Sequence, residues 1–262
     1  MERRTRLAAL LAAAALVVFT GVGATTHATA PAAPARSAHA PAKSATKSTA
    51  EAAASKPSEA ATRPWPGLMQ GNKRFVAGEH LVHPVRELRE ELANGQHPDV
   101  IVLTCSDSRL SPEWIFDQTL GELFVVRTAG NVVDPIALGS IEYAVEHLHA
   151  KLIVVMGHDK CGAVSAALSG ETMPTDNLDT IMRKIRPGIP PARTGASKDE
   201  TLDAAVRANV RRSATDVVVA SPIVREHVVQ GSVSVVQAVY HLASGQVEEL
   251  RTSDQLSESD HD

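Results

Sequence analysis

The sequence predicts an α/β fold in which a central, mostly parallel β-sheet is flanked by helices. Three observations lead to this prediction: four short runs of β-branched and apolar residues, amphipathic helical patterns between them, and the alternation of the two along the chain. Strands that are covered on both faces read as continuous apolar runs, as the first three of these do. Such alternation favours right-handed crossovers and a parallel sheet, in which ligands bind beyond the carboxyl ends of the strands.

The expected strands are short and mostly apolar. They comprise residues 100–103 (VIVL), 123–126 (LFVV), 152–156 (LIVVM) and 233–236 (VSVV). Candidate functional residues follow directly after the first and the third of these runs. The carboxyl edge of the sheet is therefore where we expect a site.

Helices are expected before and between these strands. Residues 65–78 form an amphipathic pattern before the first strand, and residues 136–148 and 201–219 each carry an apolar stripe. The stripes consist of Ile141, Ala144, Val145 and Leu148, and of Leu202, Ala205, Val206 and Val210. Ser197 and Glu200 have the spacing of a capping box at the start of the last helix. Residues 174–195, which contain several prolines, are expected to form an irregular connection.

The chain divides by composition into four parts. Residues 1–30 have a basic start, an apolar run and small residues near the end, which is the pattern of a signal peptide, with cleavage favoured after Ala28. An uncleaved membrane anchor over residues 7–24 is the alternative, and Arg3 and Arg4 leave the choice between general secretory and twin-arginine export open. The protein is expected to be exported, to the periplasm, the cell envelope or the medium.

The other three parts are a tether, one folded domain and a tail. Residues 31–62 are rich in Ala, Pro, Ser and Thr and are expected to be disordered. Residues 63–250 hold the one folded domain, and residues 251–262 form an acidic, disordered tail. The 262 residues, of which 44% are hydrophobic, carry a net charge of −4 and only 3% aromatic residues. No basic stripe or stacking surface points to nucleic acid, and a membrane partner is expected only if the signal segment stays as an anchor.

The chain has two cysteines, and both follow a predicted strand. Cys105 comes just after residues 100–103, and His158 and Cys161 come just after residues 152–156. Two thiolates and an imidazole are ligands that Zn²⁺ prefers, and three protein ligands leave a fourth tetrahedral position open for catalysis. In an exported protein, the alternative for two cysteines is a structural disulfide.

Each of these residues also has a simpler interpretation. A histidine such as His158 is more often an ordinary surface or capping residue than a ligand. Asp107 and Arg109, two and four residues after Cys105, have the spacing of a simple loop salt bridge. A disulfide explains neither this charged pair nor a histidine three residues before Cys161, so the combination favours a metal site.

The two motifs together, CSDSR at 105–109 and GHxxCG at 157–162, resemble the signature motifs of the β-carbonic anhydrases. Further segments resemble that family in the same order, and the resemblance covers nearly all of residues 65–250. The matching segments are 71–75, 112–116, 121–131, 140–145, 221–223 and 231–242. The resemblance implies a β-carbonic anhydrase-like fold.

The resemblance also implies an activity and roles for individual residues. The expected reaction is reversible hydration of carbon dioxide to bicarbonate and a proton by zinc-bound hydroxide, with activity that rises above neutral pH. Cys105, His158 and Cys161 are implied as ligands of Zn²⁺. Asp107 either occupies the fourth metal position in a resting state or pairs with Arg109 and orients the hydroxide. A homodimer or a multiple of dimers is implied as well.

The chain departs from some members of the family. Val102 occupies a position where members with a regulatory bicarbonate pocket have tryptophan, and Thr119, beside Gln118, occupies a position where plant-type members have a substrate-contacting glutamine. His80, His83 and His97 are candidate proton carriers by their titration range, although ordinary solvated histidines are more common.

Two other functions remain open at the level of sequence. The same site suits hydrolysis of carbonyl sulfide or carbon disulfide, because these linear substrates differ from carbon dioxide in features that the sequence does not reveal. A non-enzymatic exported protein with a Cys105–Cys161 disulfide is the alternative from another class. Metal content separates it from an enzyme, because a disulfide leaves no thiolate to bind zinc.

Overall fold

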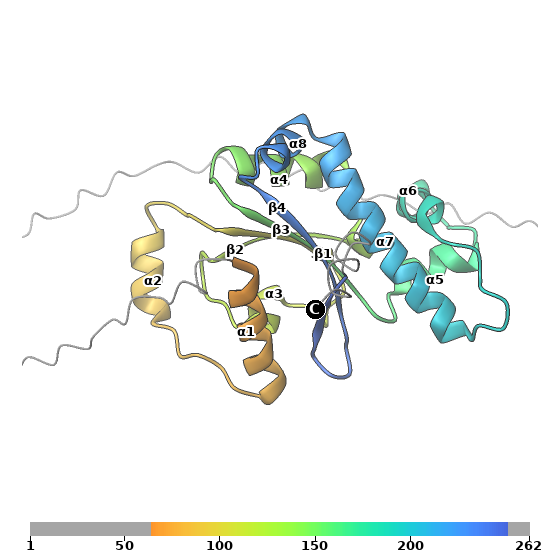
Figure 1. Ribbon diagram of the computed structural model, residues 1–262, viewed down its shortest axis with the longest axis horizontal. Helices are drawn as coiled ribbons and strands as arrows, with labels where there is room; N and C mark the ends of the chain where they lie inside the picture. Colours follow the sequence, from red (N-terminus) through yellow and green to blue (C-terminus); the bar gives the residue numbers. More distant parts are fainter. Residues whose placement is uncertain (1–63, 251–262) are drawn as a thin grey trace, which may run out of the picture. The chain divides into compact units, whose positions relative to one another are not determined.

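A computed structural model of the protein describes residues 64–250 (Figure 1). The expected signal peptide (1–30), the tether (31–62) and the acidic tail (251–262) lie outside the described residues. Among residues 64–250, no helix combines the length and the apolar character that crossing a bilayer requires.

The described chain contains a single five-stranded sheet with the order β2-β1-β3-β4-β5. The first four of these strands are parallel, and β5 is antiparallel to β4. This confirms the predicted α/β fold with a mostly parallel sheet. The strands are β1 (Val100–Cys105), β2 (Leu123–Thr128), β3 (Leu152–His158), β4 (Ser234–Tyr240) and β5 (Val247–Glu249).

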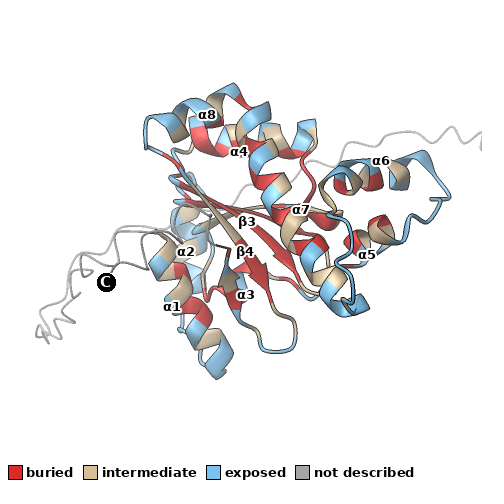
Figure 2. Ribbon diagram, turned by 45° about the vertical axis from the view of Figure 1, so that its right-hand side comes forward, coloured by how far each residue is buried: buried red, intermediate tan, exposed pale blue. Residues whose placement is uncertain are grey.

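Burial on both faces explains why the apolar runs of the two central strands, β1 and β3, are uninterrupted. Every residue of β1 and β3 is buried, as Figure 2 shows for the middle of the sheet. The two strands run in register, with Thr104 opposite Met156, and the Thr104 hydroxyl donates to the Met156 carbonyl at 2.9 Å. Their carboxyl ends therefore lie side by side, and Cys105 and His158 end the two strands.

Helices cover both faces of this sheet (Figure 1). In both views α4, α7 and α8 lie over one face, whereas α1 and α3 lie over the other. The α-helices are α1 (Pro64–Ala77), α2 (Val85–Leu92), α3 (Pro112–Ile115), α4 (Pro135–Glu146), α5 (Gly162–Ser169), α6 (Asp176–Ile185), α7 (Lys198–Ala220) and α8 (Pro222–Val229). Two 3₁₀ turns, η2 (Ala129–Asn131) and η3 (Arg186–Gly188), complete the described elements.

Several helices begin at a side chain that caps them. The capping box predicted at Ser197 and Glu200 is confirmed, since each side chain bonds the backbone amide of the other residue. Asp134 caps α4 by accepting from the Ala137 amide at 2.7 Å. These bonds satisfy amide groups that have no partner within the helix and so define where it starts.

The prediction of an irregular connection over residues 174–195 was wrong for its first half, where α6 forms. The prolines lie outside the helix, and Thr175 caps it by accepting from the Leu178 amide at 3.3 Å. Met182 and Ile185, at helical spacing, are 3% and 0% exposed. Burial of this apolar face outweighs the breaking effect that flanking prolines suggested.

Helix α1 is fixed to the core by one buried amide. Asn72 donates to the carbonyls of Ile115 and Gly245 at 3.0 and 2.9 Å, and its oxygen accepts from the Val247 amide at 2.9 Å. Gly71, on the same helix, lies in close contact with the Phe116 carbonyl. The helix thus joins the segment after α3 to the hairpin between β4 and β5.

Candidate functional site

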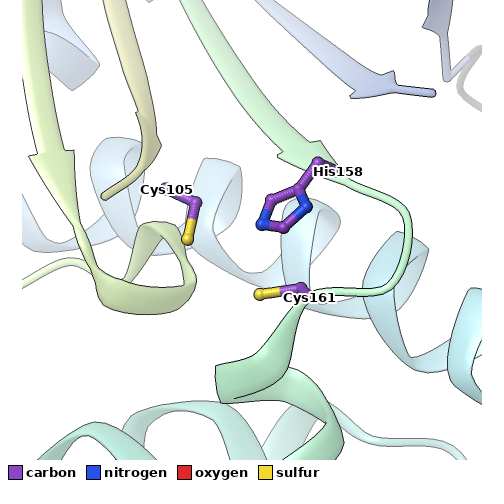
Figure 3. Close-up of side chains that lie close together, drawn as sticks. All are labelled: Cys105, His158 and Cys161. Atoms are coloured by element: carbon purple, nitrogen blue, oxygen red, sulfur yellow. The ribbon is translucent and has the colours of Figure 1, made fainter. Parts of the chain in front are cut away.

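Three buried side chains converge at the carboxyl edge of the sheet (Figure 3). Cys105 ends β1, His158 ends β3, and Cys161 lies at the N-terminus of α5. One ligand atom from each residue lies within 4.8 Å of the others. The three side chains are 5%, 0% and 2% exposed, respectively. The structure therefore brings together the three residues that the sequence predicted as metal ligands.

The two-residue connection between His158 and Cys161 makes this convergence possible. Lys160 has a φ of 52°, in the left-handed region, which is uncommon for residues other than glycine. The backbone turns there and places Cys161 opposite the imidazole. The Asp159 side chain accepts from the Leu242 amide at 3.1 Å, which ties the connection to the end of β4.

The imidazole of His158 has one nitrogen that is bonded and one that is not. Nδ1 lies 2.8 Å from the Asp159 carbonyl, so it carries the hydrogen, and the lone pair belongs to Nε2. Nε2 is buried and has no hydrogen-bond partner among the described residues. Buried polar atoms nearly always have a partner. An unpartnered nitrogen beside two sulfurs fits a metal ligand with its outer hydrogen bond already in place.

The two sulfurs are free thiols in the structure, not a disulfide. The hydrogen bond from Cys161 lowers the pKa of Cys105, and the backbone amide of Gly130, 3.3 Å from Cys105 Sγ, lowers it further. The bond that Cys161 donates, together with burial, raises the pKa of Cys161. Two buried thiolates side by side require a cation, and two sulfurs with one imidazole match the donor preference of Zn²⁺.

Asp107 and Arg109 form a bidentate pair next to this cluster. Arg109 donates from Nε to Oδ1 at 2.8 Å and from Nη2 to Oδ2 at 2.7 Å. Asp107 Oδ2 lies 3.8 Å from His158 Nε2, so the carboxylate faces the cluster. Of the two positions expected for Asp107, the structure has the one paired with Arg109.

Sequence reasoning assigned no role to Arg127, which supports this pair from the neighbouring strand. Its Nη2 donates to the Asp107 carbonyl at 2.7 Å, and its Nε donates to the Cys105 carbonyl at 3.3 Å. Arg127 pairs with Thr104 in the register of β1 and β2. The available signal was its place at the end of a predicted strand, inside one of the segments that resemble the family.

Other residues singled out from sequence lie elsewhere. His80 and Gln118 line a separate cavity of about 360 Å³, together with Trp114 and Asp117. Gln118 donates to the carbonyls of Phe116 and Asp117, at 2.9 and 3.2 Å. None of the three candidate proton carriers, His80, His83 and His97, belongs to the cysteine and histidine cluster found among residues 64–250.

Comparison with known proteins gives a consistent result. The sequence model of the family described as "Carbonic anhydrase" matches residues 100–247. Carbonic anhydrase of Mycolicibacterium smegmatis is 42% identical over 191 residues, which cover 70% of this chain and 90% of that protein. Carbonic anhydrase 2 of Mycobacterium tuberculosis is 40% identical over 187 residues, covering 69% and 88%.

Solved structures resemble the fold as well. The β-carbonic anhydrase of Coccomyxa is 33% identical, with a TM-score of 0.55, over 62% of this chain and 75% of that one. One of two tetrameric β-carbonic anhydrases from Sordaria macrospora is 28% identical, with a TM-score of 0.57, over 64% and 87%.

Proposed function

The chain belongs to the β-carbonic anhydrase family, and from that premise we propose that Cys105, His158 and Cys161 bind Zn²⁺ for the reversible hydration of carbon dioxide to bicarbonate and a proton. One observation carries the zinc assignment. The unpartnered Nε2 of His158 is buried within 4.8 Å of two cysteine sulfurs, and this donor set is one that a thiophilic divalent cation satisfies.

When bound, zinc supplies a Lewis acid that lowers the pKa of a water molecule at the open coordination position. Two thiolates donate more charge than imidazoles do, so we expect this pKa to lie above that of a three-histidine site and activity to rise above neutral pH. The chain then has to orient the nucleophile and keep the site ordered.

Asp107 is the residue placed to orient the nucleophile. Its carboxylate faces the cluster, and the bidentate bond from Arg109 keeps it ionised, so it acts only as an acceptor. A nucleophile that donates its hydrogen to Asp107 directs a lone pair away from the carboxylate. Asp107 and Arg109 thereby form an orienting dyad for attack on the carbon of carbon dioxide.

Asp107 has a second proposed role as the fourth metal ligand in a resting state. The cause of such a change is loss of its bond to Arg109, since a free carboxylate beside the cluster is a good ligand for a divalent cation. Crystals grown at about pH 6 and pH 9 test the proposal. Carboxylate density on the metal at the lower pH supports it, and an Arg109-paired Asp107 at both values contradicts it.

The experiment that tests the main proposal uses the full chain. Zinc per chain is measured by elemental analysis, and carbon dioxide hydration is followed by stopped flow between about pH 6.5 and 9. We expect about one zinc per chain and a rate that rises with pH. Zinc-free protein whose thiols react only after reduction would establish the disulfide alternative. Zinc-loaded protein that hydrolyses carbonyl sulfide but leaves carbon dioxide unchanged would establish the alternative of a carbonyl sulfide or carbon disulfide hydrolase.

We further propose that the protein assembles as a homodimer or a multiple of dimers. The Sordaria relatives are described as tetrameric. Large apolar side chains remain exposed on the described chain, among them Trp114 at 62% and Ile136 at 80%. Light scattering coupled to gel filtration gives the mass directly, and a monomer at micromolar concentration would contradict this proposal.

Export is proposed from the pattern of residues 1–30. The full chain is expressed in a bacterium, and the protein recovered outside the cytoplasm is sequenced from its N-terminus. We expect it to begin at Thr29, after cleavage behind Ala28. An intact chain in the membrane fraction would establish an anchor, and an intact chain in the cytoplasm would contradict export.

A further inference from the structure

The turn after β2 brings a backbone amide onto the sulfur of Cys105. Gly130 N lies 3.3 Å from Cys105 Sγ and donates to it. Gly130 and Asn131 have φ values of 69° and 45°, both in the left-handed region. Two consecutive residues in this conformation, one of them not glycine, require support from their surroundings. The direction of the Gly130 N–H bond therefore depends on what fixes this turn.

Asn209, in the middle of α7, is the side chain that bonds the turn. Its Nδ2 donates to the Gly130 carbonyl at 2.8 Å and lies 3.4 Å from Asn131 Oδ1. Asn131 Nδ2 in turn donates to Ser213 Oγ, 3.3 Å away and one helical turn further along. All three polar side chains are at most 3% exposed. A buried network of this kind is stable only when its bonds are made, so it selects one conformation of the turn.

Packing around the turn limits any alternative conformation. A β-carbon on Gly130 would lie 2.7 Å from Ile185 Cδ1 and 3.2 Å from Ala163 Cβ. Ala163 comes two residues after Cys161, so the turn contacts the segment that carries another ligand. The residue after Asn209, Val210, lies against Gly157, which precedes His158. Helix α7 is therefore packed directly against the segments that present the cluster.

We propose that Asn209 is a positioning residue of the metal centre, acting by holding the Gly130 amide on Cys105 Sγ. An N–H donor to a metal-bound thiolate withdraws charge from the sulfur and fixes its orientation, and loss of such a partner changes metal affinity or activity by about 10- to 100-fold. This inference rests on the proposed zinc function and extends it to a residue of α7 that touches neither metal nor substrate.

The first test replaces Asn209 with a side chain that has the same branched heavy-atom skeleton and no amide. In Asn209→Leu we expect zinc affinity, measured by chelator competition, to fall by about 10-fold or more. We also expect the thiolate-to-cobalt absorption bands of the Co²⁺-loaded protein to shift, because the sulfur loses its hydrogen bond. Val217→Ala is the matched control: Val217 lies eight residues beyond Asn209 on the same helix and is 0% exposed, so its truncation lowers stability while the hydrogen bonds from Asn209 remain.

A second measurement needs no variant and remains informative if Asn209→Leu does not fold. The full chain is labelled with ¹⁵N and loaded with ¹¹³Cd²⁺ as an NMR probe. Scalar coupling between the cadmium and the Gly130 amide proton is expected, because a hydrogen bond to a metal-bound sulfur transmits it. Its absence in folded, cadmium-loaded wild-type protein would overturn the inference.

The outcomes separate this inference from the proposed function. If the wild-type chain binds no metal, the proposed function fails. If the wild type binds metal, and Asn209→Leu keeps wild-type affinity and cobalt bands, the function stands and Asn209 is only a structural residue. An equal change in Val217→Ala would likewise overturn the inference, since it would trace the effect to stability alone.

Discussion

Arg109 and Asp107 lie in a fork-to-fork contact, with two parallel hydrogen bonds of 2.8 and 2.7 Å and a third from the Arg109 backbone amide at 3.0 Å. The side-chain hydrogen bonds from Arg109 are the largest influence on the carboxyl and hold the pKa of Asp107 well below its usual range. The carboxylate is therefore ionised at every pH at which the protein is expected to work. It only accepts hydrogen bonds, and while it is paired with Arg109 the guanidinium plane sets its orientation.

Asp107→Asn is expected to reduce kcat/KM for carbon dioxide hydration by about 100-fold, with zinc content unchanged. The amide has nearly the same shape as the carboxylate, but it can donate as well as accept and so loses control of the nucleophile. Stopped-flow kinetics with parallel zinc analysis provide the measurement. Asp99→Asn, which alters an exposed pair with Lys151, is the control, and a wild-type rate in Asp107→Asn would contradict the assigned role.

Cys161→Ala is expected to lose nearly all zinc, together with hydration activity. Removal of Cys161 leaves only Cys105 and His158 as protein ligands. Two ligands bind zinc much more weakly than the three that a catalytic zinc site has. Elemental analysis of the purified chain measures the loss. His227→Ala changes a partly buried histidine that pairs with Glu146 and lies outside the metal cluster, and it should keep full zinc. Stoichiometric zinc in Cys161→Ala would show that the metal lies elsewhere.

Two glycines of α1 are expected to respond in opposite directions to alanine. Gly71→Ala places a methyl group against the Phe116 backbone and should lower the free energy of unfolding by about 2–4 kcal/mol. Gly67→Ala has nothing within 4 Å of the new carbon and should raise it by about 0.5–1 kcal/mol, because alanine favours the helix. Urea denaturation of the two variants gives both values. Equal effects would show that α1 does not approach Phe116 as described.

The ion pair between Arg207 and Glu248 predicts a pH-dependent part of stability. The side-chain bonds from Arg207, at 2.7 and 2.8 Å, chiefly lower the pKa of Glu248, from 4.5 to about 2. A carboxyl group with a lower pKa in the folded state stabilises the fold above pH 4.5, and this stabilisation is lost as the pH falls through about 2. Both side chains are partly exposed, so solvent screening limits the contribution to about 1 kcal/mol.

Arg207→Met should therefore unfold more easily than wild type at about pH 7, with the difference shrinking towards about pH 3. Urea denaturation at both pH values measures it. Arg211→Met, on the same helix, removes an exposed arginine for which the described residues offer no ion-pair partner, and it should show no such trend. A difference that grows on acidification would contradict the sign of the argument.

The sequence alone predicted the features that depend on residues close together along the chain. The runs at 100–103 and 152–156 are apolar because both faces of β1 and β3 are covered, and this pattern identified the two central strands. Cys105 and His158 were predicted to share a site because both follow predicted strands, and ligands bind beyond the carboxyl ends of strands in a parallel sheet. Free thiols at that edge agree with the metal site and not with the disulfide alternative.

The parts that the sequence did not predict depend on contacts between distant segments. Asn209 lies 79 residues from Gly130, and a polar residue in a helical pattern carries no sign of its partner. Strand β5 has only three residues, Val247–Glu249, and two of them are charged, so no apolar run marks it. Its place is set by pairing with β4 and by the bond from Val247 to Asn72.

The crossover between β1 and β3 also determines when the site can form during folding. Thr104 and Met156, which form a hydrogen bond near the ends of β1 and β3, lie 52 residues apart along the chain. His158 and Cys161, in contrast, are only three residues apart. A complete ligand set therefore appears only after a long loop has closed, which is slow compared with local helix formation. Until then both thiols are accessible to oxidants, and afterwards they are 5% and 2% exposed. We therefore expect sheet closure to be the step that shields the cysteines from oxidants.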